Sequence, residues 1–155
     1  MTFTTTTTPA GYELSDDPAR FDLARAYHWI SAESYWAKGI PLVTFERAVR
    51  NCLLLGVYDP AGRMAAMARV VTDRATFGWI CDVFVDESHR GAGLGKAIMA
   101  YLKAHPDLQG LRRLHLATAD AHGLYAQFGF GPLQNTDRWM EIWDPDVYAR
   151  GAAGA

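Results

Sequence analysis

The segment with the clearest chemical potential is a glycine-rich turn that starts at Arg90. Glycines occupy positions 91, 93 and 95, directly before a stretch with helical spacing. Glycine lets the backbone approach a ligand closely or adopt a positive φ. The first amide groups of a helix have no acceptor within it, and with the helix dipole they favour an anion. Because Arg90 and Lys96 add positive charge, the turn is predicted to bind a phosphate or pyrophosphate group.

Two well-known nucleotide motifs do not match this turn. The dinucleotide pattern G-x-G-x-x-G differs from the G-x-G-x-G spacing found here. The P-loop needs Ser or Thr after its lysine, whereas Ala97 follows Lys96. A turn that only packs against a sheet is the alternative, so the neighbouring elements have to be considered.

Periodicity and turn signals predict an α+β chain with a central antiparallel meander and a later β-α-β unit. Helices are expected over residues 19–31, 41–51, from the glycine turn to about 104, and over 120–129. Strands are expected at residues 12–15, 52–59, 63–73, 75–86, 112–119, 128–133 and 138–144. Residues 1–11, rich in threonine, are predicted to be a disordered lead-in, 12–148 a single domain and 149–155 a flexible tail.

Composition narrows the possible partners. The 155 residues have a formal net charge of −2 and no obvious basic face, which disfavours nucleic acid as a partner. The apolar runs are too short to cross a membrane, and the N-terminus does not look like a secretory signal. Cys52 and Cys81 lie in apolar runs and are expected to be free, buried thiols, which favours a cytoplasmic location. The histidine spacing predicts no metal site.

Two motifs together resemble the GNAT superfamily of acyl-CoA-dependent N-acyltransferases. The first motif, Q/R-x-x-G-x-G/A, is met by Arg90, Gly93 and Gly95. The second motif, a tyrosine shortly before a Gly-Phe pair, is met by Tyr125 and Gly129-Phe130. The specific likeness covers residues 81–130, and the order of elements extends it over 12–144. The resemblance implies a mixed, mostly antiparallel sheet with a splayed central strand pair, flanked by helices.

The resemblance further implies an acetyltransferase that uses acetyl-CoA (coenzyme A) as co-substrate. An acetyl group would pass to a primary amine by direct attack in a ternary complex. The pantetheine arm would lie along the backbone of Val83, Phe84 and Val85, and Thr118 stands where many relatives carry an asparagine that touches the cofactor. The pyrophosphate would bind the turn formed by Arg90, Gly91, Ala92, Gly93, Leu94, Gly95 and Lys96.

The same resemblance assigns chemical roles outside the turn. Tyr125 would protonate the departing thiolate, and Asp82, on the strand before the turn, is the candidate base. Glu33 would hold the acceptor ammonium group, between walls formed by Tyr35 and Trp36. Each of these residues also has a structural interpretation: a core tyrosine, a strand aspartate, a solvated glutamate and packed aromatic rings.

The near-neutral charge favours a small amine or amino-acid-like metabolite as the acceptor over a polyamine or a histone-like substrate. Two other classes stay open: a non-catalytic acyl-CoA sensor and a partner-binding domain without a cofactor. Tyr125 and Asp82 favour the enzyme over the sensor, and the glycine turn argues against the partner-binding domain. The family resemblance leaves a homodimer open.

Overall fold

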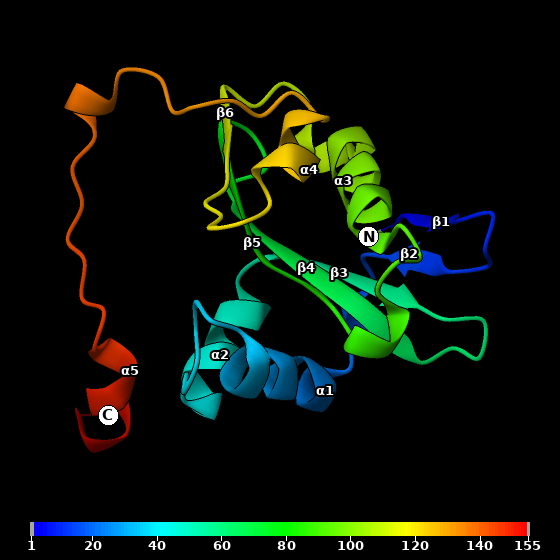
Figure 1. The fold of residues 1–155 in the computed structure, drawn as a ribbon, viewed down its shortest axis with the longest axis horizontal. Helices are drawn as coiled ribbons and strands as arrows, with labels where there is room; N and C mark the ends of the chain where they lie inside the picture. The colour runs from blue at the N-terminus through cyan, green and yellow to red at the C-terminus, as the bar shows by residue number, and fades with distance from the viewer. Residues whose placement is uncertain (1, 155) are drawn as a thin grey trace.

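The structure is a computed structural model, and it describes residues 2–154. A six-stranded sheet forms its centre, in the spatial order β1-β2-β3-β4-β5-β6 (Figure 1). All neighbouring strands are antiparallel except β5 and β6, which are parallel. The predicted mixed, mostly antiparallel sheet is therefore confirmed. The strands are β1 (Thr5–Thr7), β2 (Glu13–Ser15), β3 (Leu53–Tyr58), β4 (Met64–Thr72), β5 (Phe77–Val85) and β6 (Arg113–His115).

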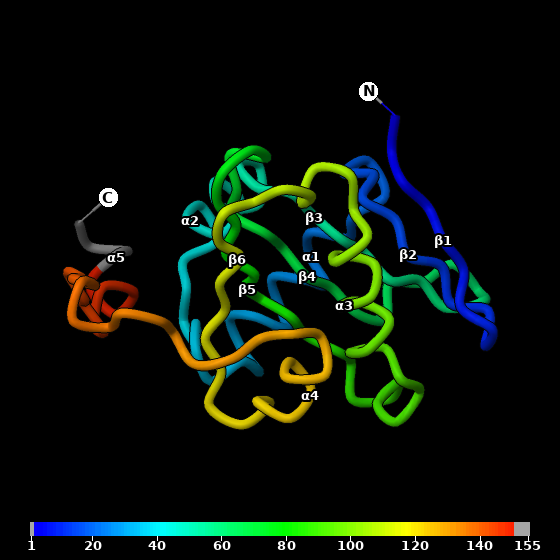
Figure 2. The backbone as a smooth tube through the Cα atoms, turned by 90° about the horizontal axis from the view of Figure 1, so that it is seen from above, coloured from blue at the N-terminus to red at the C-terminus, as the bar shows by residue number. Residues whose placement is uncertain are grey.

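Helices cover the two faces of this sheet (Figures 1 and 2). On one face lie α3 (Leu94–Ala104) and α4 (His122–Ala126), and on the other lie α1 (Leu23–His28) and α2 (Leu42–Arg50). Each face has its own buried cluster, with Ile98 on the α3 side and Phe45 on the α2 side. Among residues 2–154, no helix combines the length and apolar character that a membrane crossing requires.

The first predicted helix, residues 19–31, is divided into three pieces. A 3-10 turn at Pro18–Arg20 comes first, and α1 begins only after Asp22, whose side chain accepts the Arg25 amide at 3.0 Å. A π-helical turn, Trp29–Glu33, then ends the element. Such wider turns often occur at functional sites, and this one leads directly into the segment of Tyr35 and Trp36.

The prediction of a disordered lead-in is wrong for β1, which pairs with β2. The Thr4 amide donates to Asp16, and the Thr4 carbonyl accepts the Tyr101 hydroxyl at 2.8 Å. Asp16 also contacts Nε2 of the buried His105 at 2.8 Å. These long-range contacts fix the threonine segment, whose β-branched side chains suit a strand.

The two final strands predicted at 128–133 and 138–144 do not form. Residues 131–147 are all exposed. Figures 1 and 2 show that the chain leaves the body beyond β6 before it reaches α5 (Val147–Gly154). The expected flexible tail is therefore helical over most of its length. Gly131 and Pro132 explain part of the difference, because proline has no amide for a ladder and glycine weakens a strand.

Candidate active site

The site is built where β5 and β6 separate. The two strands pair only from Phe77 to Trp79, after which β6 ends at His115 while β5 continues to Val85. This is the splayed strand pair that the family resemblance implies. A cavity of about 410 Å³ lies in the opening. Its lining comes from both strands, α4 and the segment after α1: Tyr35, Trp36, Trp79, Ile80, Cys81, Asp82, Val83, Leu116, Ala117, Thr118, Ala119, Asp120, Ala121 and Tyr125.

An extra residue in β5 shapes one wall of this cavity. Opposite β4, Met67 pairs with Phe84 and Arg69 pairs with Cys81, so two residues of β5 face one of β4. Asp82 lies in this bulge with a φ of +51°. A non-glycine residue in that region is strained, and bulges are frequent beside active sites.

Both carboxylate oxygens of Asp82 are engaged. Nε of Arg69 donates to one oxygen at 2.5 Å, and the indole Nε1 of Trp36 donates to the other at 2.8 Å. The Asp82 side chain is only 4% exposed and that of Arg69 is 17% exposed. The structure thus places the predicted base at the cavity, within a buried ion pair that holds Trp36.

Tyr125 lies on α4 and is buried in the cavity wall. Burial raises the pKa of its hydroxyl, and the nearby Tyr35 and Asp120 raise it further. The phenol therefore keeps its proton above its ordinary pKa of 10.0. Among residues 2–154, it has no hydrogen-bond partner, which leaves the phenol able to donate to a ligand atom.

One side of the cavity has aromatic walls. Tyr35 accepts the Ala119 amide at 3.1 Å, and its ring packs edge-on against Trp36 with the centroids 4.9 Å apart. Trp79, 46% exposed, completes this side. Glu33 is placed differently, because its carboxylate lies 3.2 Å from Nε2 of His28 and, within the described residues, it is not part of the lining.

The glycine turn lies at the far end of β5 and leads into α3. Gly91 and Gly93 have φ values of +83° and +76°, a region that L side chains rarely adopt. Ala97 donates to the Gly93 carbonyl in the first helical hydrogen bond, so the amides before Ala97 are not used by the helix. Gly95 serves packing, because a Cβ there would lie 3.2 Å from the Leu124 side chain.

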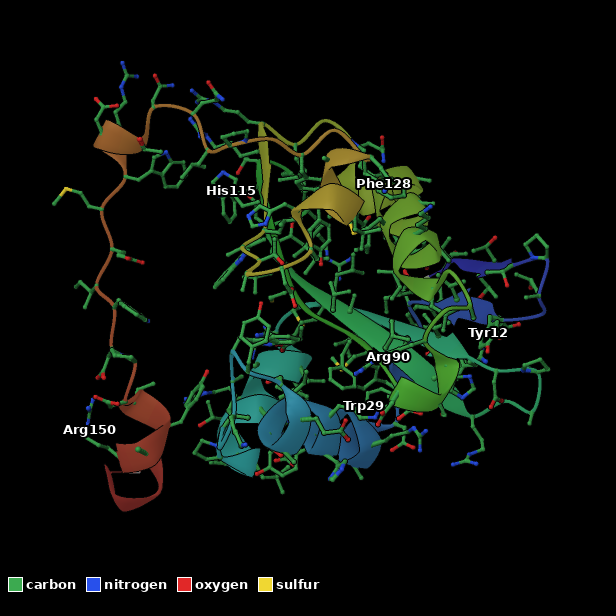
Figure 3. The ribbon with its side chains drawn as sticks, in the orientation of Figure 1. Tyr12, Trp29, Arg90, His115, Phe128 and Arg150 are labelled. Atoms are coloured by element: carbon green, nitrogen blue, oxygen red, sulfur yellow. The ribbon has the colours of Figure 1, made fainter. Side chains whose placement is uncertain are left out.

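Arg90 fixes the start of this turn to the strand (Figure 3). Its Nε donates to the Val85 carbonyl at 3.2 Å, and its guanidinium lies 5.8 Å from the centroid of the Phe84 ring. Phe84 in turn stacks on Trp29 at 5.4 Å, away from the cavity. Of the three residues predicted to bind pantetheine, Phe84 can therefore offer only its backbone.

The two cysteines are free and half-buried. Burial raises the pKa of the Cys52 thiol to about 11 and that of Cys81 to about 12. Because the thiolate is the reactive form, neither residue is a nucleophile near neutral pH, although Cys81 lines the cavity.

A larger cavity, of about 780 Å³, lies beside Thr4, Asp16, Arg74 and His105. It contains none of the predicted site residues, and its buried carboxylate is already bonded to His105. This cavity is the larger of the two, but several of the predicted site residues line the cavity of about 410 Å³.

Comparison with known proteins identifies the class of enzyme. Residues 12–130 match the family model described as "Acetyltransferase (GNAT) family". The chain is similar to a GNAT-family protein of Xanthomonas campestris pv. campestris, with 43% identity, a TM-score of 0.87, and coverage of 93% of this chain and 99% of that one. A Gibberella zeae protein named as a candidate acetyltransferase is 26% identical, and the match covers 77% of this chain and 78% of that protein.

A more distant structure shares the fold. It is a predicted acetyltransferase from Clostridium acetobutylicum, crystallised with acetyl-CoA, with 16% identity, a TM-score of 0.55, and coverage of 85% of this chain and 94% of that one. The chain belongs to the GNAT acetyltransferase family. The prediction of an acyl-CoA-dependent N-acetyltransferase is thereby confirmed.

Asp82→Asn is expected to destabilise the protein, because it leaves the Arg69 guanidinium without its counter-charge. Removing one partner of a buried pair typically lowers the free energy of unfolding by about 3–5 kcal/mol, and the partial exposure of Arg69 favours the lower end. Urea unfolding measures the change. The double variant Asp82→Asn/Arg69→Met should recover most of the loss, since neither charge is then left unpaired. A single variant as stable as the wild type would show that the pair does not support the bulge.

Proposed function

We propose that the protein transfers the acetyl group of acetyl-CoA to the primary amine of a small molecule, by direct attack in a ternary complex. The observation that carries this proposal is the geometry of β5. Its open edge runs from the cavity that contains Tyr125 to the glycine turn at the start of α3. One extended ligand with an anionic end and a reactive end fits that path.

Coenzyme A would bind along this path in two ways. Its pyrophosphate would accept hydrogen bonds from the free amides of Leu94, Gly95 and Lys96, with Arg90 and Lys96 supplying positive charge. Its pantetheine arm would pair with the backbone of residues 83–85, as an added strand pairs with a sheet edge. The Clostridium acetobutylicum neighbour crystallised with acetyl-CoA supports the choice of this co-substrate for the fold.

The reaction forms one bond and breaks another. The neutral amine attacks the thioester carbonyl, the new C–N bond forms, and the oxyanion is stabilised by a backbone amide of β5. The C–S bond then breaks, and the thiolate takes a proton from the Tyr125 hydroxyl. The nitrogen releases its own proton to water, and a proton from the solvent restores the Tyr125 phenol, so the products are an amide and free coenzyme A.

Asp82 was predicted to take the proton of the nitrogen, and its environment suggests a different main role. Both of its oxygens already accept hydrogen bonds, so a proton could bind only at the expense of the Arg69 or Trp36 contact. We therefore propose that Asp82 chiefly positions the Trp36 wall and that water in the cavity mouth removes the proton.

The acceptor we propose is a compact amine with an apolar portion. The cavity volume lies within the range of small-molecule sites. Tyr35, Trp36 and Trp79 offer ring faces to an alkyl chain and to the approaching ammonium group, which aromatic rings attract. Asp120, exposed at the rim, adds a negative charge. The Glu33 contact with the acceptor and the cytoplasmic location stay predictions.

Gly93→Ala is expected to weaken coenzyme A binding by more than it weakens the fold. A Cβ at Gly93 meets no atom within 4 Å, so its only structural effect is the positive φ, worth roughly 1–2 kcal/mol. Calorimetry with coenzyme A measures the affinity. Gly62→Ala is the matched control, because Gly62 has a φ of +82° and equally open surroundings in the β3–β4 hairpin. Equal loss of stability in both variants with unchanged coenzyme A affinity in Gly93→Ala would move the pyrophosphate elsewhere.

Tyr125→Phe should keep coenzyme A binding and lower kcat by roughly 10²–10⁴-fold, the usual range for a general acid. In the wild type, the raised pKa keeps the phenol protonated through neutral pH, so the rate should fall only above the ordinary pKa of 10.0. The variant should lack that alkaline decline. Thiol release from acetyl-CoA with a panel of amines measures both effects. Binding without thiol release in the wild type would instead indicate the acyl-CoA sensor.

Trp36→Leu is expected to raise the KM for the acceptor about tenfold, while the KM for acetyl-CoA stays constant, because a wall of the cavity is lost. Trp36→Phe is the control that keeps an aromatic ring, and its effect should be smaller. Steady-state kinetics with each substrate varied separates the two constants.

An Asp82→Asn variant that loses kcat with an unchanged acceptor KM would assign the base to Asp82 after all.

A further inference from the structure

His89, the residue directly before Arg90, makes contacts that the proposed reaction does not use. Its side chain is 20% exposed and lies between two hairpins from other parts of the chain. On one side, the Tyr12 hydroxyl and Nδ1 of His89 are 2.9 Å apart and share a hydrogen bond. On the other side, Nε2 of His89 lies 3.9 Å from Oδ2 of Asp59, in the β3–β4 hairpin. The chain thus brings three distant segments together at this imidazole ring.

The glycine turn itself has few side chains that could fix it. Gly91, Ala92 and Gly93 are exposed, and a Cβ built on either glycine would meet no atom within 4 Å among residues 2–154. On the helix side, the buried Leu94 holds the start of α3. Because glycine leaves the backbone free to rotate, the turn takes a defined direction only if its strand side is held as well.

Both partners of His89 are themselves fixed. Oδ1 of Asp59 accepts the amides of Ala61 and Arg63, each at 2.9 Å, which leaves Oδ2 to face His89. The Arg63 and Ala61 amides, with the nearby His89, lower the pKa of the Asp59 carboxyl, so this group stays negative toward the imidazole. The Tyr12 ring packs edge-on against His89, with the centroids 5.6 Å apart. Figure 3 shows Tyr12 on the side of the molecule where Arg90 leaves β5.

The other end of the same short segment is also held. The 3-10 turn Glu87–His89 follows Asp86, whose carboxylate accepts the Trp29 indole at 3.1 Å and whose amide donates to the Ala65 carbonyl at 2.9 Å. The His89 amide donates to the Asp86 carbonyl at 2.9 Å. Asp86 therefore fixes where the segment starts, and His89 fixes where it ends, immediately before the glycine turn.

We propose that His89 is a positioning residue for coenzyme A, which aligns Arg90 and the first amides of α3 through its contacts with Tyr12 and Asp59. Both ring nitrogens of His89 face the hairpins, so the residue acts through the turn and not through the ligand. The inference rests on the proposed binding of coenzyme A at this turn. Groups that are already aligned lose less conformational freedom on binding, so losing the anchor lowers affinity without removing a ligand contact.

Calorimetry with coenzyme A tests the anchor from both sides. Tyr12→Phe removes only a hydroxyl and should raise the Kd about fivefold, the effect of one ordinary hydrogen bond. His89→Ala also removes the Asp59 contact and should raise the Kd about tenfold. The double variant should bind no more weakly than His89→Ala alone, because both changes remove the same contact. Unchanged affinity in the single variants, or effects that multiply in the double variant, would overturn the proposal.

Two further variants separate positioning from a general loss of structure. His89→Asn keeps a polar atom near the place of Nδ1, so it should recover much of the affinity that His89→Ala loses. Tyr27→Phe is the matched control, because its hydroxyl donates to the Ile40 carbonyl at 3.0 Å, far from the turn on the α1 side. It should lower stability to urea as Tyr12→Phe does and leave the Kd unchanged. Equal loss of coenzyme A affinity in Tyr27→Phe would contradict a specific role for His89.

Steady-state kinetics adds a readout that a merely structural role would not give. The His89 and Tyr12 variants should raise the KM for acetyl-CoA while kcat and the acceptor KM stay constant, because the cavity around Tyr125 is unchanged. A parallel change in all three constants would overturn positioning. Gly93→Ala distinguishes the two proposals: if it weakens coenzyme A binding and the His89 and Tyr12 variants do not, only the role of His89 falls. If Gly93→Ala has no effect either, the turn is not the coenzyme A site and both proposals fall.

Discussion

The extra residue at Asp82 decides which side chains of β5 face each side of the sheet. In a regular strand, Phe84 would face the same side as Ile80, because side chains alternate with a period of two. The bulge reverses this, so Ile80 packs in the cluster on the α3 side while Phe84 stacks on Trp29 on the opposite side. The strand β5 thereby contributes side chains to the buried clusters on both faces of the sheet. The positive φ of Asp82 is held by its bonds to Arg69 and Trp36, so the buried ion pair fixes the geometry of the strand at this point.

The position of the glycine turn follows from that reversal. Once Phe84 is fixed on Trp29, the Trp29 indole donates to Asp86 at 3.1 Å, and Arg90 donates back to Val85. The end of β5 is therefore held at several points before the turn begins. The amides at the start of α3 then face a fixed direction relative to the cavity, which is what a ligand with two separated binding groups requires.

Much of this arrangement could be predicted from the sequence, because strong periodicity and short motifs are local properties. The strands from β2 to β5, the helices α2 and α3, the glycine turn and Tyr125 all carried such signals. Arg69 was missed, although an arginine within an apolar strand signals a buried counter-charge and Asp82 lies on the next strand. The exposure of Trp79 could not be predicted, since it depends on where β6 stops. The strand predicted at residues 138–144 does not form, because alternation alone does not supply a neighbouring strand edge with which the segment could pair.

The open cavity has its origin in the short ladder between β5 and β6. Pairing stops at Trp79 and His115, so β5 keeps a free edge for a ligand beyond this point. Trp79 lies at this limit and forms part of the cavity wall. A longer β6 would extend the sheet and close the path that we assign to pantetheine. The incomplete sheet is therefore the condition for ligand entry along β5.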